Sequence, residues 1–162
     1  MERKPKIISV DDQREVLAAL EKDLQILSPF FDLFFCESAE EAREVIEEID
    51  GDGDYIPLII CDHIMPGMNG IDFLIDLNQD ERFKKVQKML LTGLATHRDT
   101  INAINEADVD FYVEKPWDKE TLLNAIKILV TRYVVDVGMD YSELNEVLDP
   151  ASLYKAIREK ES

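Results

Sequence analysis

Short apolar runs alternate with longer stretches of helical periodicity along most of the chain. The runs contain four or five residues each, and turn or polar residues flank them. Between the runs, apolar residues recur at steps of three and four, as in an amphipathic helix that faces a core. The pattern predicts five strands, at residues 6–10, 32–36, 58–61, 88–92 and 110–113.

A helix is predicted after each strand. Ser38 followed by Glu41 forms a capping-box pattern for the second helix, and Thr96 with Asp99 is a similar start for the fourth. Asp118 precedes the last long helix of this series. The predicted helices cover residues 16–27, 38–49, 71–78 and 96–107, and the last begins near 118.

Five strand and helix units in succession predict an α/β fold. Each pair of parallel strands needs a crossover connection, which the intervening helices provide. A parallel sheet between two helical layers follows from this order. Phe111 and Tyr112 are neighbours in the fifth strand, so we expect one of them to face the core and the other a helix layer.

The segment 135–162 follows a different pattern. Asp140 with Glu143, and Asp149 before Pro150, are start signals for two short helices. Helices below ~12 to 15 residues are marginal on their own, so we expect this segment to dock, to dimerise or to begin something longer. The apolar side chains of its second helix are Leu153, Tyr154 and Ile157.

Composition narrows the class of partner. The chain has 162 residues, of which 35 are acidic and 18 basic, and its net charge of -17 argues against binding to nucleic acid or to an anionic membrane. No apolar run approaches the ~20 residues of a membrane span, and the charged start is not a signal peptide, so we expect a cytoplasmic protein. Cys36 and Cys61 lie in apolar stretches and are expected to be buried free thiols.

Polar residues stand where four of the predicted strands end. Asp11 and Asp12 follow the first strand, Asp62 follows the third, Thr92 ends the fourth, and Lys115 follows the fifth. In an open α/β sheet the functional crevice lies beyond the carboxyl ends of the strands. We therefore expect three carboxylates, a hydroxyl and an ammonium group to meet at one edge of the sheet.

These groups suit the handling of a phosphoryl group. Three clustered carboxylates raise one another's pKa values unless a cation lies among them, and Mg²⁺ suits an open site with oxygen ligands. Lys115 can pair with a carboxylate or with an added anion, and the Thr92 hydroxyl can donate to the same anion. An aspartate oxygen can act as a nucleophile and form an aspartyl phosphate, so a carboxylate of this cluster is a candidate acceptor.

With these residues in place, the sequence resembles the receiver domain of two-component response regulators over about residues 5–134. The matching motifs are the Asp11–Asp12 pair, Asp62 in CDHIMPGMNG, Thr92 in LLTG and Lys115 in YVEKPW. Each motif is weak alone, but four in order, each at a strand end, are specific. The resemblance implies a CheY-like (flavodoxin-like) five-stranded parallel sheet of order 2-1-3-4-5 and a cis peptide bond before Pro116.

The resemblance also implies the role of each carboxylate. Asp62 would accept a phosphoryl group from a phosphohistidine of a sensor histidine kinase or a phosphotransfer protein. Mg²⁺ would be bound by Asp12, Asp62 and the backbone carbonyl of Ile64, with Asp11 acting directly or through water. The protein would then be a phosphoacceptor switch that catalyses only its own phosphotransfer and dephosphorylation, and not an enzyme with a separate substrate.

Further residues would carry the signal outward. Lys115 and Thr92 would bind the phosphate oxygens, and Tyr112 would change rotamer when Thr92 moves. The face formed by the fourth helix, the fifth strand and the fifth helix would change on phosphorylation. A homodimer could form through that face or through the C-terminal helix.

The same residues also have other interpretations. Asp11 and Asp12 can cap the first helix, Lys115 can be an ordinary surface lysine, and Thr92 can be a plain strand residue. A metal-dependent phosphohydrolase with an aspartyl nucleophile is the alternative function. Enzymes of the haloacid-dehalogenase type need a second acid two residues after the nucleophile, and Ile64 occupies that position.

The domain division expected from these patterns is a receiver domain at 1–134 and a helical extension or linker at 135–162. Twenty-eight residues are too few for an output domain with its own core. The chain is therefore expected either to act through protein contacts as a single-domain regulator or to be the receiver part of a longer protein.

Overall fold

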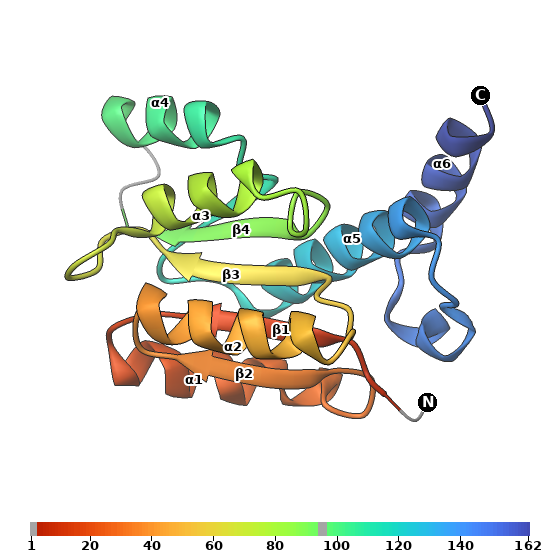
Figure 1. Ribbon diagram of the computed structural model, residues 1–162, viewed down its shortest axis with the longest axis horizontal. Coiled ribbons are helices and arrows are strands. Elements are labelled where there is room, and N and C mark those ends of the chain that lie inside the picture. The colour runs from red at the N-terminus through yellow and green to blue at the C-terminus, as the bar shows by residue number, and fades with distance from the viewer. Residues whose placement is uncertain (1–2, 94–96) are drawn as a thin grey trace.

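The computed structural model describes residues 3–93 and 97–162 (Figure 1). Strands and helices alternate along the chain, and two further helical segments follow the last long helix. The elements are β1 (Lys6–Val10), α1 (Arg14–Leu24), the 3₁₀ helix η1 (Gln25–Leu27), β2 (Asp32–Cys36), α2 (Ala39–Gly51), β3 (Leu58–Asp62), α3 (Gly70–Gln79), β4 (Gln87–Thr92), α4 (Arg98–Ala107), β5 (Phe111–Glu114), α5 (Lys119–Val137), the 3₁₀ helix η2 (Ser142–Val147) and α6 (Pro150–Glu161).

The strands form one parallel sheet in the order β2-β1-β3-β4-β5, which confirms the predicted topology. Helices α2 and α3 cover one face of the sheet and α1 and α5 cover the other (Figure 1). Every residue of β1 and of β3 is buried, because central parallel strands are covered on both faces. The predicted strand limits agree with the structure to within one residue.

The expectation for β5 was wrong. Phe111 and Tyr112 are both exposed, by 43% and 45%, and Val113 is the buried residue of this strand. β5 is one of the two edge strands of the sheet, and α4 packs mainly against α3. Both faces of β5 are therefore partly open at its first two residues, and alternation along the strand does not separate a buried side from an exposed one.

Two helix starts were predicted from capping patterns with different outcomes. The Ser38 hydroxyl accepts from the backbone N–H of Glu41 at 3.1 Å, so the capping box at α2 is confirmed. The predicted cap at Thr96 lies outside the described residues. Within them, α4 begins after His97, whose side chain makes no capping hydrogen bond.

The second half of α5 is buried nearly all round. Its residues Val130, Thr131, Tyr133, Val134 and Val135 are all buried, although a helix on a two-layer surface exposes one face. The C-terminal segment supplies the cover: η2 buries Leu144 and Val147, and α6 packs along α5. α5 itself continues to Val137, past the division expected after residue 134.

Polar contacts fasten this segment to α5. The backbone N–H of Asp149 donates to the Thr131 hydroxyl at 2.9 Å, and Lys160 Nζ donates to the Val135 carbonyl at 2.7 Å. Asp149 also caps α6 by accepting from the N–H of Ser152, with Pro150 in the first turn as predicted. Of the three apolar residues named for the second of these helices, Leu153 and Ile157 pack against the core while Tyr154 is 65% exposed.

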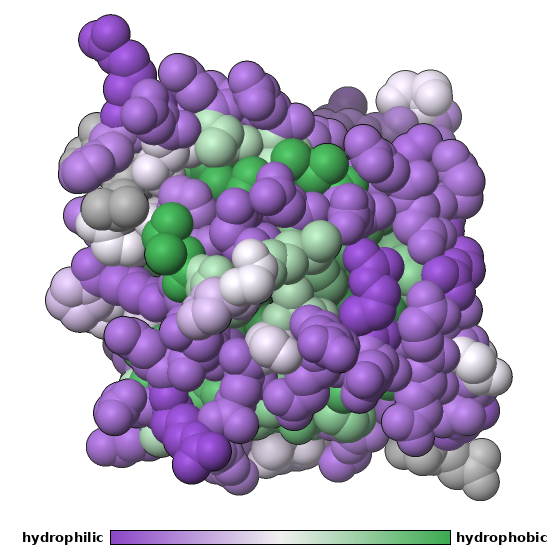
Figure 2. All heavy atoms as spheres, turned by 60° about the vertical axis from the view of Figure 1, so that its left-hand side comes forward, coloured by the Kyte–Doolittle hydropathy of each residue, from purple (hydrophilic) through white to green (hydrophobic). Residues whose placement is uncertain are grey.

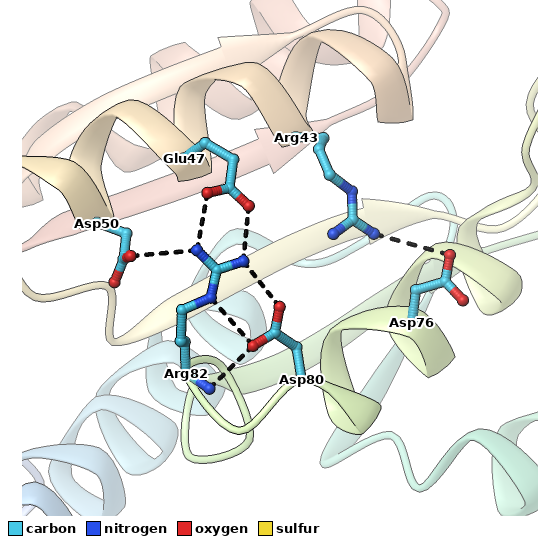
Figure 3. Close-up of polar contacts among 6 residues, drawn as sticks. All are labelled: Arg43, Glu47, Asp50, Asp76, Asp80 and Arg82. Atoms are coloured by element: carbon cyan, nitrogen blue, oxygen red, sulfur yellow. Dashed lines mark hydrogen bonds and ion pairs between the residues drawn. The ribbon is translucent and has the colours of Figure 1, made fainter.

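An ion-pair network joins α2 to the loop after α3 (Figure 3). The Arg82 guanidinium pairs with Glu47 at 2.7 Å, with Asp80 at 2.9 Å and with Asp50 at 3.3 Å. The forked guanidinium can serve several carboxylates at once, which a lysine cannot do with the same geometry. These ion pairs hold the segment that precedes β4 next to the C-terminal end of α2.

Cys36 and Cys61 are buried free thiols, as predicted. Burial raises the pKa of Cys36 to about 12 and also raises that of Cys61, so neither forms a thiolate readily. Among helices of the described residues, none combines the length and the apolar character needed to cross a membrane.

Candidate functional site

The predicted site residues meet at the carboxyl-terminal edge of the sheet. Asp62 and Thr92 are the last residues of β3 and β4, and Asp11 and Lys115 follow β1 and β5. Because these strands are parallel neighbours, their ends bring the four side chains to one place. A cavity of about 610 Å³ opens there, lined by Asp12, Asp62, Thr92 and Lys115 with the loop 63–66.

Lys115 bridges two buried carboxylates. Its Nζ donates to Asp62 Oδ1 at 2.7 Å and to Asp11 Oδ2 at 2.9 Å. Asp11 is fully buried and Asp62 is 7% exposed. The other Asp11 oxygen accepts from the backbone N–H of Gln13 at 2.8 Å, so Asp11 has partners on both oxygens. A buried carboxylate needs such partners to offset its lost hydration.

The pKa values of Asp62 and Lys115 are both raised, for different physical reasons. Burial raises the pKa of Asp62, and the Asp11 charge adds to this, whereas the Lys115 hydrogen bond opposes it. Burial alone would lower the pKa of Lys115, but its hydrogen bonds to Asp62 and Asp11 outweigh burial, so this pKa is raised. Only one ammonium group lies near these three described carboxylates, so the site has excess negative charge.

The three aspartates are arranged as a set of oxygen donors. Asp11, Asp12 and Asp62 each offer one oxygen, and these atoms all lie within 4.8 Å of one another. Asp12 is exposed while the other two are buried, so the set faces solvent on one side. Carboxylate oxygens with access to water are the donors that Mg²⁺ prefers. Ile64, whose carbonyl was the fourth expected ligand, lines the same cavity and is 61% exposed.

The loop between β3 and α3 folds back over Asp62. The backbone N–H of His63 donates to the Leu91 carbonyl at 3.2 Å, and that of Gly70 donates to the His63 carbonyl at 2.8 Å. A Cβ atom at position 70 would lie 1.8 Å from the Asp62 carbonyl oxygen. Position 70 therefore requires glycine.

His63 is a cavity residue that was not among the candidates. Its Nδ1 lies 3.5 Å from the Thr92 hydroxyl oxygen, and burial lowers the pKa of its imidazole. Thr92 itself is 1% exposed. The signal in the sequence was position alone, because His63 directly follows Asp62. A single histidine without a second nearby gave no reason to expect a metal ligand.

The remaining candidates lie close to the expected places. The Lys115–Pro116 peptide bond is cis, as predicted, and the Lys115 N–H donates to the Thr92 carbonyl at 2.9 Å. Tyr112 is on β5 with 45% of its surface exposed. The cavity, the donor set and the lysine bridge thus occupy one edge of the sheet, with Tyr112 on the strand that leads to it.

A family comparison decides what this arrangement is. The family model described as "Response regulator receiver domain" matches residues 7–127. The chain belongs to this family. It is a receiver domain of the two-component type, a signalling switch, and the phosphohydrolase alternative receives no support.

Individual relatives agree with this family. The receiver is 27% identical over 125 residues to chemotaxis protein CheY1 of Helicobacter pylori, covering 77% of this chain and 96% of CheY1. It is 28% identical over 121 residues to the hydrogenase transcriptional regulatory protein HoxA of Cupriavidus necator, covering 75% of this chain. The match spans only 23% of HoxA, so the chain corresponds to one part of that longer regulator.

Solved structures share the fold. The signal receiver domain of an HD domain-containing protein from Pseudomonas fluorescens superimposes with a TM-score of 0.69 at 28% identity, over 81% of this chain and 98% of that one. Receiver domains act with histidine kinases and output domains, and they generally bind Mg²⁺ at their acidic pocket. The three-aspartate set of this receiver fits such an ion by its chemistry.

Proposed function

We propose that Asp62 of this receiver accepts a phosphoryl group from a phosphohistidine, carried by a sensor histidine kinase or a phosphotransfer protein. The observation that carries the proposal is the position of the Asp62 carboxylate. It ends the central strand β3, is held by Lys115 at 2.7 Å, and borders an open cavity. A carboxylate oriented by one cation and still accessible on one side is ready to act as a nucleophile.

The transfer is an in-line displacement. An Asp62 oxygen forms a bond to phosphorus while the bond from phosphorus to the donor's imidazole nitrogen breaks, and that nitrogen keeps the electron pair. Lys115 can stabilise the negative charge added to Asp62, because its ammonium group already contacts the carboxylate that is being modified. The Thr92 hydroxyl, at the end of the neighbouring strand, is the second donor proposed for the phosphoryl oxygens.

Asp11, Asp12 and Asp62 would hold the Mg²⁺, with the Ile64 carbonyl as a further ligand. When bound, the ion neutralises charge on the phosphoryl oxygens as the transfer proceeds. The chain's own contribution is to keep the carboxylates in place: Gln13 and Lys115 orient Asp11, and the loop closed by Gly70 supports Asp62.

Phosphorylation adds nearly two negative charges beside Lys115 and Thr92. Movement of Thr92 toward them, followed by Tyr112, is the proposed route to the face of α4, β5 and α5. Ile101, Phe111 and Tyr112 on that face are each more than 40% exposed, which supports a role in binding a partner, an output domain or a second copy. We place this switch in the cytoplasm.

The phosphodonor would approach the edge of the sheet seen in Figure 2. That face is mostly hydrophilic, with a group of apolar side chains near its centre. Ile64 and Met68, in the loop that follows Asp62, are 61% and 43% exposed. Exposed apolar side chains beside the acceptor support docking of a protein donor there rather than access by small phosphate esters alone.

Phosphorylation with acetyl phosphate and Mg²⁺ tests the assignment. Intact-mass spectrometry should show one phosphoryl group per chain, and Asp62→Asn should abolish it. Asp136→Asn, which changes an exposed aspartate at the far end of α5, is the matched control and should be labelled like the wild type. Labelling that survives Asp62→Asn, or no labelling of the wild type, would overturn the proposal.

A further inference from the structure

The loop between β5 and α5 is anchored to a helix from the other end of the domain sequence. Trp117, the one tryptophan of the chain, donates its indole N–H to Asp23 Oδ2 at 2.8 Å. Asp23 lies in the last turn of α1, and both side chains are partly buried. Trp117 follows Lys115 by two residues, so this contact lies next to the lysine of the site.

The segment 115–118 is short and held at each end. The backbone N–H of Lys115 donates to the Thr92 carbonyl at 2.9 Å. At the other end, the Asp118 carboxylate caps α5 by accepting from the N–H and the hydroxyl of Thr121, both at 3.0 Å. A displacement of Trp117 therefore moves the backbone of Lys115, because only Pro116 separates the two residues in the chain.

Lys115 needs a defined backbone position to do two tasks. In the resting site its Nζ lies between Asp11 and Asp62, at 2.9 Å and 2.7 Å. After phosphorylation the same group must reach an oxygen added to Asp62. Lysine has a flexible stem and donates as a point charge, so the geometry of its contact depends on where the backbone places it.

We propose that Trp117 is a positioning residue for Lys115: its hydrogen bond to Asp23 fixes the loop on α1 and thereby sets the affinity of the site for the phosphoryl group. The inference rests on the proposed function of Asp62. A purely structural role, in which the bond only joins α1 to α5, predicts altered stability but no selective change at the site.

The binding of two ligands distinguishes the positioning role from the purely structural role. Beryllofluoride, which imitates the phosphoryl group on an aspartate, would gain a contact from Lys115, whereas Mg²⁺ alone would be held by the carboxylates. Asp23→Ala removes the acceptor and Trp117→Phe removes the donor while keeping an aromatic ring. We expect each to weaken beryllofluoride binding by roughly five-fold, as the loss of a hydrogen bond to a charged group allows, and to leave Mg²⁺ binding unchanged.

The measurement is isothermal titration of each variant of the 162-residue chain, first with Mg²⁺ and then with beryllofluoride in excess Mg²⁺. Asp23→Asn keeps an acceptor oxygen and should restore wild-type affinity. In a Lys115→Ala background, Asp23→Ala should cause no further loss. Lys160→Met breaks a hydrogen bond of similar burial at the opposite end of α5 and should change neither affinity.

The outcomes distinguish the inference from its premise. Wild-type protein that fails to bind beryllofluoride contradicts the proposed function of Asp62. Wild-type binding with unchanged affinity in both Asp23→Ala and Trp117→Phe overturns the positioning role, as does an equal weakening of Mg²⁺ and beryllofluoride. A loss confined to beryllofluoride, with recovery in Asp23→Asn, supports it.

Discussion

Gly70 and Asp62 are in such close contact that a Cβ atom at position 70 would lie 1.8 Å from the Asp62 carbonyl oxygen. The Gly70 N–H also donates to the carbonyl of His63, the next residue along. The first turn of α3 is thus built directly onto the backbone of the acceptor. Stability and site geometry share this contact, and a change at position 70 should affect both.

Gly70→Ala should destabilise the domain by about 2 kcal/mol or more, because the added methyl group would clash with the backbone of Asp62. Beryllofluoride binding should weaken as well, since the displaced atom belongs to Asp62. Urea unfolding and titration measure the two effects. Gly51→Ala is the control, since among the described residues no atom beyond its chain neighbours and the nearby backbone of its own helix lies within 4 Å of the added Cβ, and its stability should not fall. If Gly70→Ala and Gly51→Ala were equally stable, the close contact between Gly70 and Asp62 would be contradicted.

Mg²⁺ should stabilise the wild type through the aspartate set. At a concentration ten times the dissociation constant, the free energy of unfolding should rise by about 1.4 kcal/mol. Asp62→Asn should remove most of this gain, because it removes one of three donors within 4.8 Å. Asp136→Asn should keep it. Thermal unfolding with and without chelator measures the change, and a full Mg²⁺ effect in Asp62→Asn would argue against the site.

Asp62 should also make stability depend on pH in the absence of metal. Burial raises the pKa of Asp62 in the folded state, so the folded protein binds this proton more tightly than the unfolded chain. Stability should therefore fall as pH rises through the window above ~4, the ordinary aspartate value. Asp62→Asn should flatten this part of the curve and should be the more stable protein at neutral pH. Urea unfolding from pH 4 upward in chelator compares the two proteins, and identical curves would contradict the raised pKa.

Lys88 provides an opposite pH dependence. Its side chain is fully buried in β4, where the ammonium group donates to the carbonyls of Phe83 and Lys84. Burial lowers the pKa of Lys88 to about 8, so above that value the folded state loses a proton that the unfolded chain keeps. Stability should rise with pH between 8 and 10.5, by about 3 kcal/mol in total.

Substitution isolates this contribution from other groups that titrate in the same range. Lys88→Met should abolish the rise, whereas Lys85→Met, at an exposed position, should keep it. The measurement is urea unfolding at intervals from pH 7.5 to 10.5. If the difference in stability between wild type and Lys88→Met does not change with pH, the buried lysine is not charged below pH 8 as described.

The C-terminal segment should behave as part of the folded unit. Leu144 is 1% exposed in η2, and Leu144→Ala should cost about 2 to 4 kcal/mol in the free energy of unfolding. Tyr154→Ala, at a residue 65% exposed in α6, should cost little. Both effects are read from one cooperative unfolding transition. A separate early transition for the segment, with the receiver unaffected by Leu144→Ala, would show that it is only loosely attached.

The sequence pattern by itself determined the strands, their parallel arrangement and the principal site, whereas the strand order followed from the family resemblance. Strand limits were predictable because apolar runs end sharply at polar residues, as at Cys61 and Asp62. The site was predictable for a topological reason: parallel strand ends meet at one edge, so Asp11, Asp62 and Lys115 had to come together.

Only the tertiary structure decided how the elements cover one another. Tyr112 is exposed because β5 is an edge strand, and Thr131 is buried because the C-terminal segment returns to α5. Trp117 meets Asp23 across 94 positions of sequence. Local periodicity reports which side of an element is apolar. It does not report which neighbour lies against that side or how closely two backbones approach. Both depend on packing between residues that are far apart in the chain.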